Sequence, residues 1–165
     1  MQISKHFKLS EFTKSQVATR NGIKNMPGSG DIKNLGNVAY EILEPVRAKF
    51  EKPVMINSGY RCLELNRKIG SSDSSQHTKG MAVDFEIIGT PNIQVAYWVQ
   101  NNCDFDQLIL EFYRPDEDNA GWIHASYCDG NNRKQVLTFD GKSYTDGLPE
   151  MNWENGKVKE WYGLV

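Results

Sequence analysis

Residues 75–88 read Ser-Gln-His-Thr-Lys-Gly-Met-Ala-Val-Asp-Phe-Glu-Ile-Ile. The segment is polar up to Gly80, which permits a tight backbone bend, and apolar residues then alternate with small or acidic ones. This period of two predicts a β-strand from Met81 to Ile88 with one face on a core. On that strand Asp84 points away from the apolar face, so the bend and the strand bring His77 and a carboxylate together.

Helical patterns dominate before this strand, and strand patterns dominate after it. Apolar residues spaced by three and four predict a helix over 32–50, which Pro45 should kink or shorten. Further helices are predicted over 7–20, 62–69 and 93–99, and further strands over 54–56, 107–112, 122–127 and 133–139. Helices followed by strands that are mostly joined as hairpins predict an α+β fold. In this fold the N-terminal helices pack on a small antiparallel sheet.

The length suits one domain. The chain has 165 residues, of which 39% are hydrophobic and 11% aromatic, enough to bury a real core. We therefore expect a single domain over residues 1–165, and a monomer. Residues of about 7–139 carry the candidate motifs. The segment 140–165 is rich in glycine and aromatic residues, and we expect it to pack on the body of the domain.

Charge and hydropathy argue against several classes of protein. The 19 basic and 21 acidic residues give a net charge of −2, which argues against a nucleic-acid protein working by bulk positive charge. No apolar run approaches the roughly 20 residues of a membrane span. The N-terminus lacks the apolar stretch of a signal peptide, so we expect synthesis in a cytoplasm without an export signal. Three cysteines without a Cys-x-x-Cys pair suit reduced thiols better than a disulfide framework.

The histidines are the candidate metal ligands. There are three, and His6 in the N-terminal arm has no partner in a motif. His77 and Asp84 converge, and His124 on a later predicted strand could complete a three-ligand site. Catalytic zinc takes three protein ligands and keeps a fourth position for water. The spacing of His77 and Asp84 is by itself a weak signal, and on spacing alone a surface histidine and a solvated aspartate are the favoured interpretation.

Five segments carry a resemblance to a known family. They read Leu-Ser-Glu-Phe-Thr-x-Ser at 9–15, Leu-Glu-Pro-Val-Arg at 43–47, Ser-Gly-Tyr-Arg at 58–61, Ser-Gln-His-x-x-Gly-x-Ala-x-Asp at 75–84 and Trp-Ile-His at 122–124. Together they resemble the motif set of the M15 peptidases, the zinc D-Ala-D-Ala carboxypeptidase-like enzymes that include phage cell-wall endolysins. The first two segments are similar to the phage-type branch. The resemblance covers about residues 7–126.

The resemblance implies roles for individual residues. His77, Asp84 and His124 would hold Zn²⁺. Arg61 is similar to the family arginine that stabilises the developing oxyanion and orients the substrate, although it could also be a partner in a surface salt bridge.

Three more residues are candidates for contact with the substrate. Ser75 and Gln76 either orient His77 or touch the substrate, and a merely polar loop is the alternative. Trp122 shares a strand face with His124 and should border the site, unless its role is packing alone.

The general base is where the sequence departs from the family pattern. Family members usually place an acidic residue three positions before the last histidine, and here that position is Gly121. Glu111 is the best replacement. The competitors lie in the following loop: Asp116, Glu117 and Asp118.

A geometric argument favours Glu111. If the strands ending at 112 and beginning at 121 form a symmetric antiparallel hairpin, opposed residue numbers sum to 233. Glu111 then faces Trp122, and Ile109 faces His124, so Glu111 and His124 share one face of the sheet. A slip of one residue would turn Glu111 to the other face and leave the role to the loop acids.

The predicted function is that of a zinc metallopeptidase which hydrolyses a peptide bond in bacterial peptidoglycan. It would be a D-Ala-D-Ala carboxypeptidase or an endolysin-type endopeptidase, with the peptidoglycan peptide as its partner. A chain without an export signal would reach the cell wall after phage-mediated release or on a virion. The alternative is a non-catalytic zinc-binding virion or binding protein on the same fold.

Overall fold

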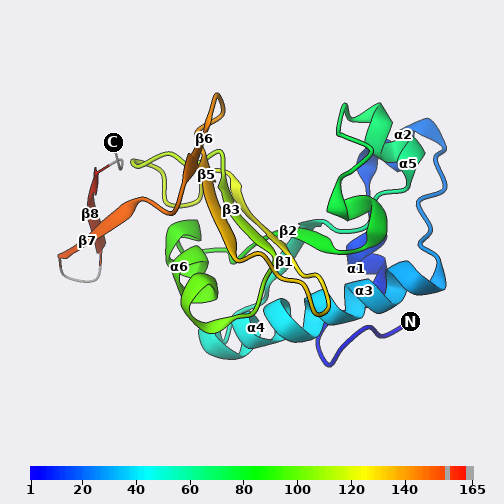
Figure 1. Ribbon diagram of the computed structural model, residues 1–165, viewed down its shortest axis with the longest axis horizontal. Coiled ribbons are helices and arrows are strands. Elements are labelled where there is room, and N and C mark those ends of the chain that lie inside the picture. Colours follow the sequence, from blue (N-terminus) through cyan, green and yellow to red (C-terminus); the bar gives the residue numbers. More distant parts are fainter. Residues whose placement is uncertain (155–156, 163–165) are drawn as a thin grey trace.

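Helices dominate the first third of the chain, and strands dominate the rest, in a computed structural model that describes residues 1–154 and 157–162 (Figure 1). The helices are α1 (Leu9–Thr13), α2 (Gln16–Asn21), α3 (Ser29–Val38), the π-helix η1 (Ala39–Leu43), α4 (Glu44–Phe50), α5 (Leu63–Lys68), the 3₁₀-helix η2 (Gln76–Lys79) and α6 (Asn92–Asn102). The strands are β1 (Met55–Ser58), β2 (Ala82–Glu86), β3 (Gln107–Glu111), β4 (Trp122–Ser126), β5 (Gln135–Phe139), β6 (Tyr144–Asp146), β7 (Glu150–Glu154) and β8 (Lys157–Tyr162). The predicted α+β class is confirmed.

The strands form a six-stranded sheet in the order β1-β2-β4-β3-β5-β6, and β7 pairs with β8 separately. All neighbours in the larger sheet are antiparallel except β3 and β5, which run parallel. The predicted antiparallel sheet is therefore confirmed except at this one pair. Both edges of β4 are occupied by β2 and β3, so β5 pairs with the remaining edge of β3.

Two helical predictions are refined by local chemistry. The segment predicted as one helix over 7–20 is split, and the Ser15 Oγ accepts a hydrogen bond from the Ala18 N–H at 3.2 Å to start α2. The long helix begins at Ser29, three residues early, and continues as α3, η1 and α4. Its π-helical turn ends at Leu43, two residues before Pro45, which has no N–H for the regular hydrogen-bond ladder.

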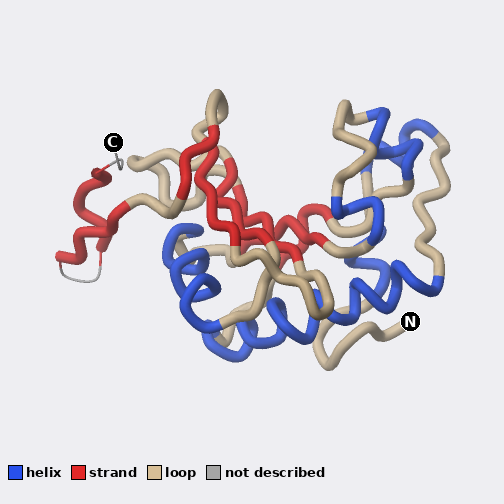
Figure 2. Tube along the Cα trace, viewed as in Figure 1, coloured by secondary structure: helices blue, strands red, loops and turns tan. Residues whose placement is uncertain are grey.

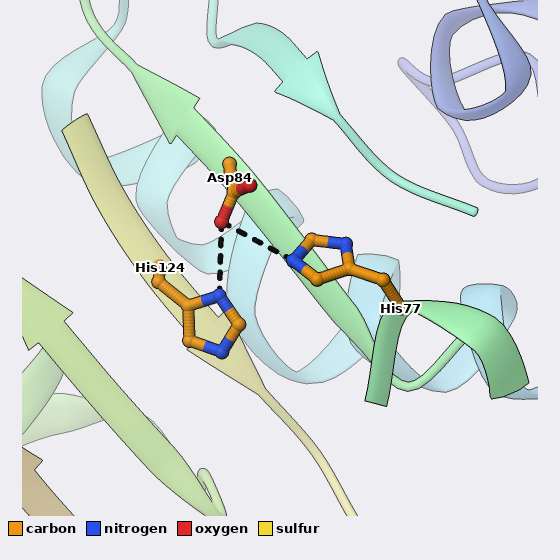
Figure 3. Close-up of side chains that lie close together, drawn as sticks. All are labelled: His77, Asp84 and His124. Carbon is orange, nitrogen blue, oxygen red and sulfur yellow. Dashed lines mark hydrogen bonds and ion pairs between the residues drawn. The ribbon is translucent and has the colours of Figure 1, made fainter. Parts of the chain in front are cut away.

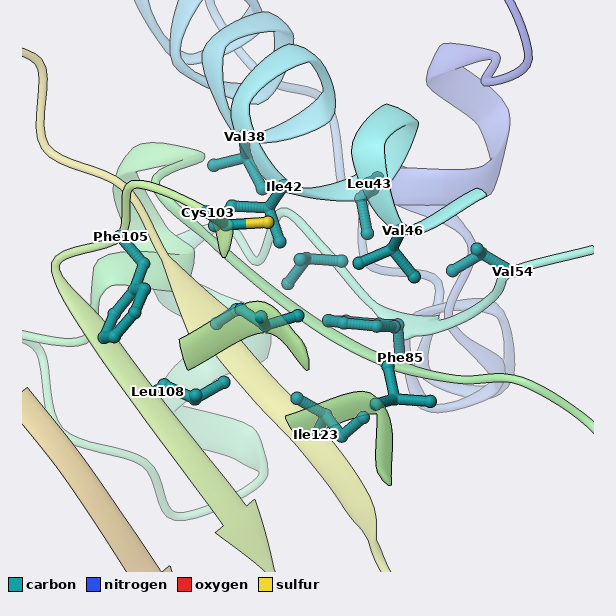
Figure 4. Packing of buried hydrophobic residues seen from close by; sticks show 14 of the residues in the cluster. Val38, Ile42, Leu43, Val46, Val54, Phe85, Cys103, Phe105, Leu108 and Ile123 are labelled. Atoms are coloured by element: carbon teal, nitrogen blue, oxygen red, sulfur yellow. The ribbon is translucent and has the colours of Figure 1, made fainter. Parts of the chain in front are cut away.

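The core lies between this long helix and one face of the sheet. Helices α3, α4 and α6 lie along that face, whereas α2 and α5 lie on the right of the view (Figures 1 and 2). In Figure 4, Ile42 and Val46 on the helix approach Phe85 on β2, and all three are fully buried. Burial of such side chains is worth about 1.5–3 kcal/mol each. The other sheet face is therefore left for polar residues.

The register of β4 places the candidate site on that second face. His124 lies opposite Asp84 on β2 and opposite Ile109 on β3, and Glu111 lies opposite Trp122. These pairs confirm the predicted hairpin register between β3 and β4. Directly opposed residues point to the same side of a sheet, so Glu111 and Trp122 share the face of Asp84 and His124.

The predicted packing of residues 140–165 is only partly described. β6 pairs with β5, Leu148 is buried, and the Tyr97 hydroxyl donates a hydrogen bond to the Pro149 carbonyl at 2.6 Å. Residues 155–156 and 163–165 lie outside the described residues, so packing of the whole segment stays a prediction. Among the helices of the described ranges, none combines the length and apolar character needed to cross a membrane.

Gly121 holds the entry into β4 in place. Its backbone has φ +67°, a left-handed conformation that other residues rarely adopt. A Cβ on Gly121 would also lie 1.7 Å from the carbonyl oxygen of Glu111, which is an impossible contact with backbone. Both constraints require glycine at this position of the hairpin.

We expect Gly121→Ala to lower the free energy of unfolding by about 3 kcal/mol or more, because conformational strain and the clash with backbone add. Gly22→Ala is the matched control, since Gly22 has φ +65° but open space around its Cα. The control should cost only about 1–2 kcal/mol. Urea unfolding of both variants measures the difference, and equal losses would show that the contact with Glu111 does not matter.

Candidate metal centre

Three side chains from three elements converge on the polar face of the sheet. His77 lies on η2, Asp84 on β2 and His124 on β4 (Figure 3). The Asp84 Oδ1 lies 3.4 Å from His77 Nε2 and 2.9 Å from His124 Nδ1. One ligand atom from each residue lies within 4.8 Å of the other two, and all three residues are largely buried. The sequence prediction that they come together is confirmed.

The backbone around His77 fixes the direction of its ring. The His77 Nδ1 lies 2.7 Å from the Gly59 carbonyl oxygen, so Nδ1–H donates there and the lone pair of Nε2 faces Asp84. The predicted bend at Gly80 is also confirmed, with φ +66° where η2 leads into β2. A Cβ on Gly80 would lie 2.4 Å from the Asp31 carbonyl oxygen, so the turn packs directly on α3.

Burial and contacts set the charge of this cluster. Burial lowers the pKa of His77, which keeps the ring neutral near pH 7. Burial by itself would raise the pKa of Asp84, but the contacts with His77 and His124 outweigh it and hold that pKa below its ordinary value. His77 therefore offers a neutral imidazole nitrogen and Asp84 a carboxylate, the protonation states that metal binding requires of these two residues.

The donor set fits a zinc ion. Zinc bonds to His nitrogen and Asp oxygen at about 2.0–2.2 Å, so two ligand atoms on a tetrahedral ion lie about 3.4 Å apart. The distance from Asp84 Oδ1 to His77 Nε2 is 3.4 Å and has that value, whereas the 2.9 Å to His124 Nδ1 is a hydrogen-bond distance that would lengthen around an ion. Two histidines and one carboxylate leave a fourth position for water, which is the arrangement of catalytic rather than structural sites.

Arg61 is tied to the same carboxylate. Its Nη2 donates to Asp84 Oδ2 at 2.9 Å, and its Nε donates to Ser58 Oγ at 2.9 Å. Burial lowers the pKa of Arg61 and the Asp84 carboxylate opposes this, but a guanidinium stays charged at any ordinary pH. The side chain is 14% exposed, so the alternative of a partner in a surface salt bridge does not describe it.

Glu111 lies within electrostatic reach of the cluster. Burial raises the pKa of Glu111 and the Asp84 charge adds to this, while His124 and Arg61 act in the opposite direction. A carboxylate with a raised pKa on the face of the metal ligands is suited to accept a proton. The sequence argument for its strand face was therefore sound.

The three competing acids lie elsewhere. Asp116, Glu117 and Asp118 are exposed in the loop between β3 and β4, and Glu117 pairs with Arg114 at 3.0 Å. Gly121, at the usual family position of the acid, cannot carry a side chain. The geometry thus favours Glu111 over all four positions.

Two hollows open beside the cluster. A groove of about 1020 Å³ is lined by Arg61, Asp84 and Trp122 together with residues of α2, α5 and β1. A second hollow of about 390 Å³ is lined by His124, Ser75 and Gln76, among others. The residues predicted to contact the substrate therefore border open space next to the metal ligands.

Gln76 has side-chain partners that the sequence did not indicate. Its side-chain amide donates to Asp106 Oδ2 at 2.9 Å and to Cys128 Sγ at 3.3 Å. Asp106 is buried and also accepts two hydrogen bonds from the Arg133 side chain through Oδ2. This network anchors η2, and with it His77, to the start of β3. Nothing in the spacing of residues 76, 106 and 133 signals the contact.

Comparison with known proteins agrees with the geometry. No curated protein matches the chain. The family model described as Peptidase M15 matches residues 5–125, a range that contains all three metal-ligand candidates, Arg61 and Glu111. The match spans well over half of the chain, and the chain therefore belongs to the M15 peptidase family.

Proposed function

We propose that the protein is a zinc metallopeptidase that hydrolyses a peptide bond in bacterial peptidoglycan. The observation that carries this proposal is the buried cluster of His77, Asp84 and His124, with Arg61 bonded to the same aspartate. Glu111 stands on the same sheet face, on the strand next to His124, and interacts electrostatically with His124, Asp84 and Arg61.

Each residue has a defined part in hydrolysis. Zinc, when bound, would supply a Lewis acid and lower the pKa of a water molecule. Glu111 accepts the proton of the attacking water and passes it to the leaving amine. Among the described contacts, the hydrogen bonds of Arg61 use Nε and Nη2 and none uses Nη1, so Nη1 can donate to the substrate carbonyl oxygen as charge develops there.

The shape of the site supports a peptide substrate. The groove is lined by Asp84 and the smaller hollow by His124, so both offer room for a peptide beside the metal ligands. The resemblance to the phage-type branch supports peptidoglycan as the source of that peptide. We further propose the cell wall as the site of action, reached after phage-mediated release or on a virion.

The first test concerns the metal. Zinc-loaded wild-type protein should contain about one zinc per chain, and His77→Ala should lose it because two ligands hold the ion poorly. His6→Ala is the matched control, since His6 is paired with Glu44 at the N-terminus. Elemental analysis after dialysis measures zinc directly. Wild-type zinc content in the His77 variant would overturn the ligand assignment.

The second test concerns Arg61. We expect Arg61→Ala to keep zinc and to cleave about 10²–10³ times more slowly, the usual cost of one lost oxyanion donor. Arg67→Ala serves as control, because Arg67 forms an exposed pair with Asp73. The measurement is the release of new free amines from purified peptidoglycan. Near-normal turnover of the Arg61 variant would show that Arg61 only holds Asp84 in place and does not take part in catalysis.

The third test separates the enzyme from its alternative. Glu111→Gln keeps the shape of the side chain but removes the base, so it should bind zinc and release almost no free amines. Glu117→Gln, in the exposed loop, should cleave at the parent rate. If the Glu111 variant keeps the parent rate, another group is the base. If zinc-loaded wild-type protein releases no amines at all, the non-catalytic zinc-binding role is favoured.

A further inference from the structure

A continuous group of aromatic rings extends from Trp122, two residues before His124 on β4, to the edge strand β6. The ring of Phe112 lies 5.0 Å from that of Trp122 and 5.0 Å from that of Phe139, measured between centroids. Phe139 is stacked on Tyr144 at 4.5 Å. We call these four residues the aromatic row. Phe112 is 42% exposed and Tyr144 57% exposed, so the row is open to a ligand.

Strand register places the aromatic row on the face of the candidate active site. Trp122 is opposite Glu111, and Phe139 is opposite Tyr144. In the parallel pair of β3 and β5, Ile109 lies opposite Leu137. Residues two positions apart on a strand share a face, so Glu111 and Phe139 point to the same side of the sheet as Ile109 and Leu137. The row therefore continues the surface that carries Glu111 and His124.

Phe112 reaches this position through a strained backbone conformation. Its φ is +52°, a conformation that is a true outlier for a bulky side chain. Strict alternation would turn Phe112 to the face opposite Glu111, but its ring instead contacts Trp122 and Phe139. A costly conformation that presents an exposed aromatic ring beside an active site indicates a binding role.

We propose that the aromatic row binds the glycan strand of the substrate, a β-1,4-linked polymer of N-acetylated hexosamines. The C–H groups on one face of a sugar ring pack on the electron-rich face of an aromatic ring, and the remaining hydroxyl groups stay in water. This proposal rests on the proposed function, since the glycan is what carries the peptide stems.

The spacing of the row suits that substrate. Neighbouring strands lie about 4.8 Å apart, and β3 lies between β4 and β5. Phe139 on β5 is therefore about 10 Å across the sheet from Trp122 on β4. A stem of three extended residues spans a similar length of about 10 Å. A peptide held beside Trp122 could therefore leave its sugar at the level of Phe139, where the exposed ring is that of Tyr144 stacked on it. Trp122 lines both the groove and the row, so the two surfaces are continuous.

The binding test uses a soluble glycan without peptide. Titration with chitotetraose, a tetramer of β-1,4-linked N-acetylglucosamine, should quench or shift tryptophan fluorescence and perturb the NMR signals of the row. We expect Tyr144→Ala to raise the Kd by about five-fold, since one stacking ring is lost. Tyr40→Ala is the matched control, because Tyr40 is similarly exposed on η1, away from the row. No saturable binding, or an equal effect in the control, would overturn the proposal.

A second readout separates this proposal from the proposed function. For Tyr144→Ala, the rate on intact peptidoglycan should fall about five-fold relative to the rate on a sugar-free stem peptide. An unchanged ratio, with active wild-type enzyme, would overturn glycan binding and leave the peptidase intact. If the wild-type protein cleaves neither substrate, the proposed function is wrong. Glycan binding by the aromatic row is then tested by the chitotetraose titration alone. Concentration-dependent dimerisation lost in Tyr144→Ala would instead assign the row to a second copy.

Discussion

The pairing of β4 with both of its neighbours is the constraint on which the candidate site depends. β4 supplies His124 and Trp122, while β2 supplies Asp84 and β3 supplies Glu111. Because side chains alternate between faces, a slip of one residue along either edge would turn one of these groups into the core. The apolar residues of the same strands prevent that slip, since they would move into water. The packing of the core therefore fixes the strand register, and the strand register fixes the geometry of the site.

Asp84 concentrates the electrostatics of this face. Its two oxygens serve different partners: Oδ1 faces the histidines, and Oδ2 accepts from Arg61. A carboxylate buried to this degree is stable only when charged or strongly donating groups surround it. The hydrogen bond that offsets the burial of Asp84 also holds the guanidinium of Arg61 beside the metal ligands. The buried carboxylate of Asp84 therefore both contributes to the candidate metal site and orients the Arg61 side chain.

The departure at Gly121 has a structural explanation. The backbone enters β4 so close to Glu111 that no side chain fits at position 121, where the resemblance led us to expect an acid. In this chain the acid on the site face comes from the neighbouring strand instead. The strained backbone of Phe112 follows directly after Glu111, so this end of β3 presents both the candidate base and the aromatic row.

The sequence alone determined the strands that carry Asp84, Glu111 and His124 and the register of the hairpin between β3 and β4. It could do so because the alternation of side chains is a local property of the chain. The three metal-ligand candidates, which lie far apart in the sequence, came from the family resemblance of the combined motifs. Only the tertiary structure decided the parallel pairing of β5, the anchoring of Gln76 by Asp106, and the bond between Arg61 and Asp84. Those features join residues 23 to 30 positions apart in the chain. Their partners are selected by which edges and donors remain unused after the core has packed, and no local pattern records that.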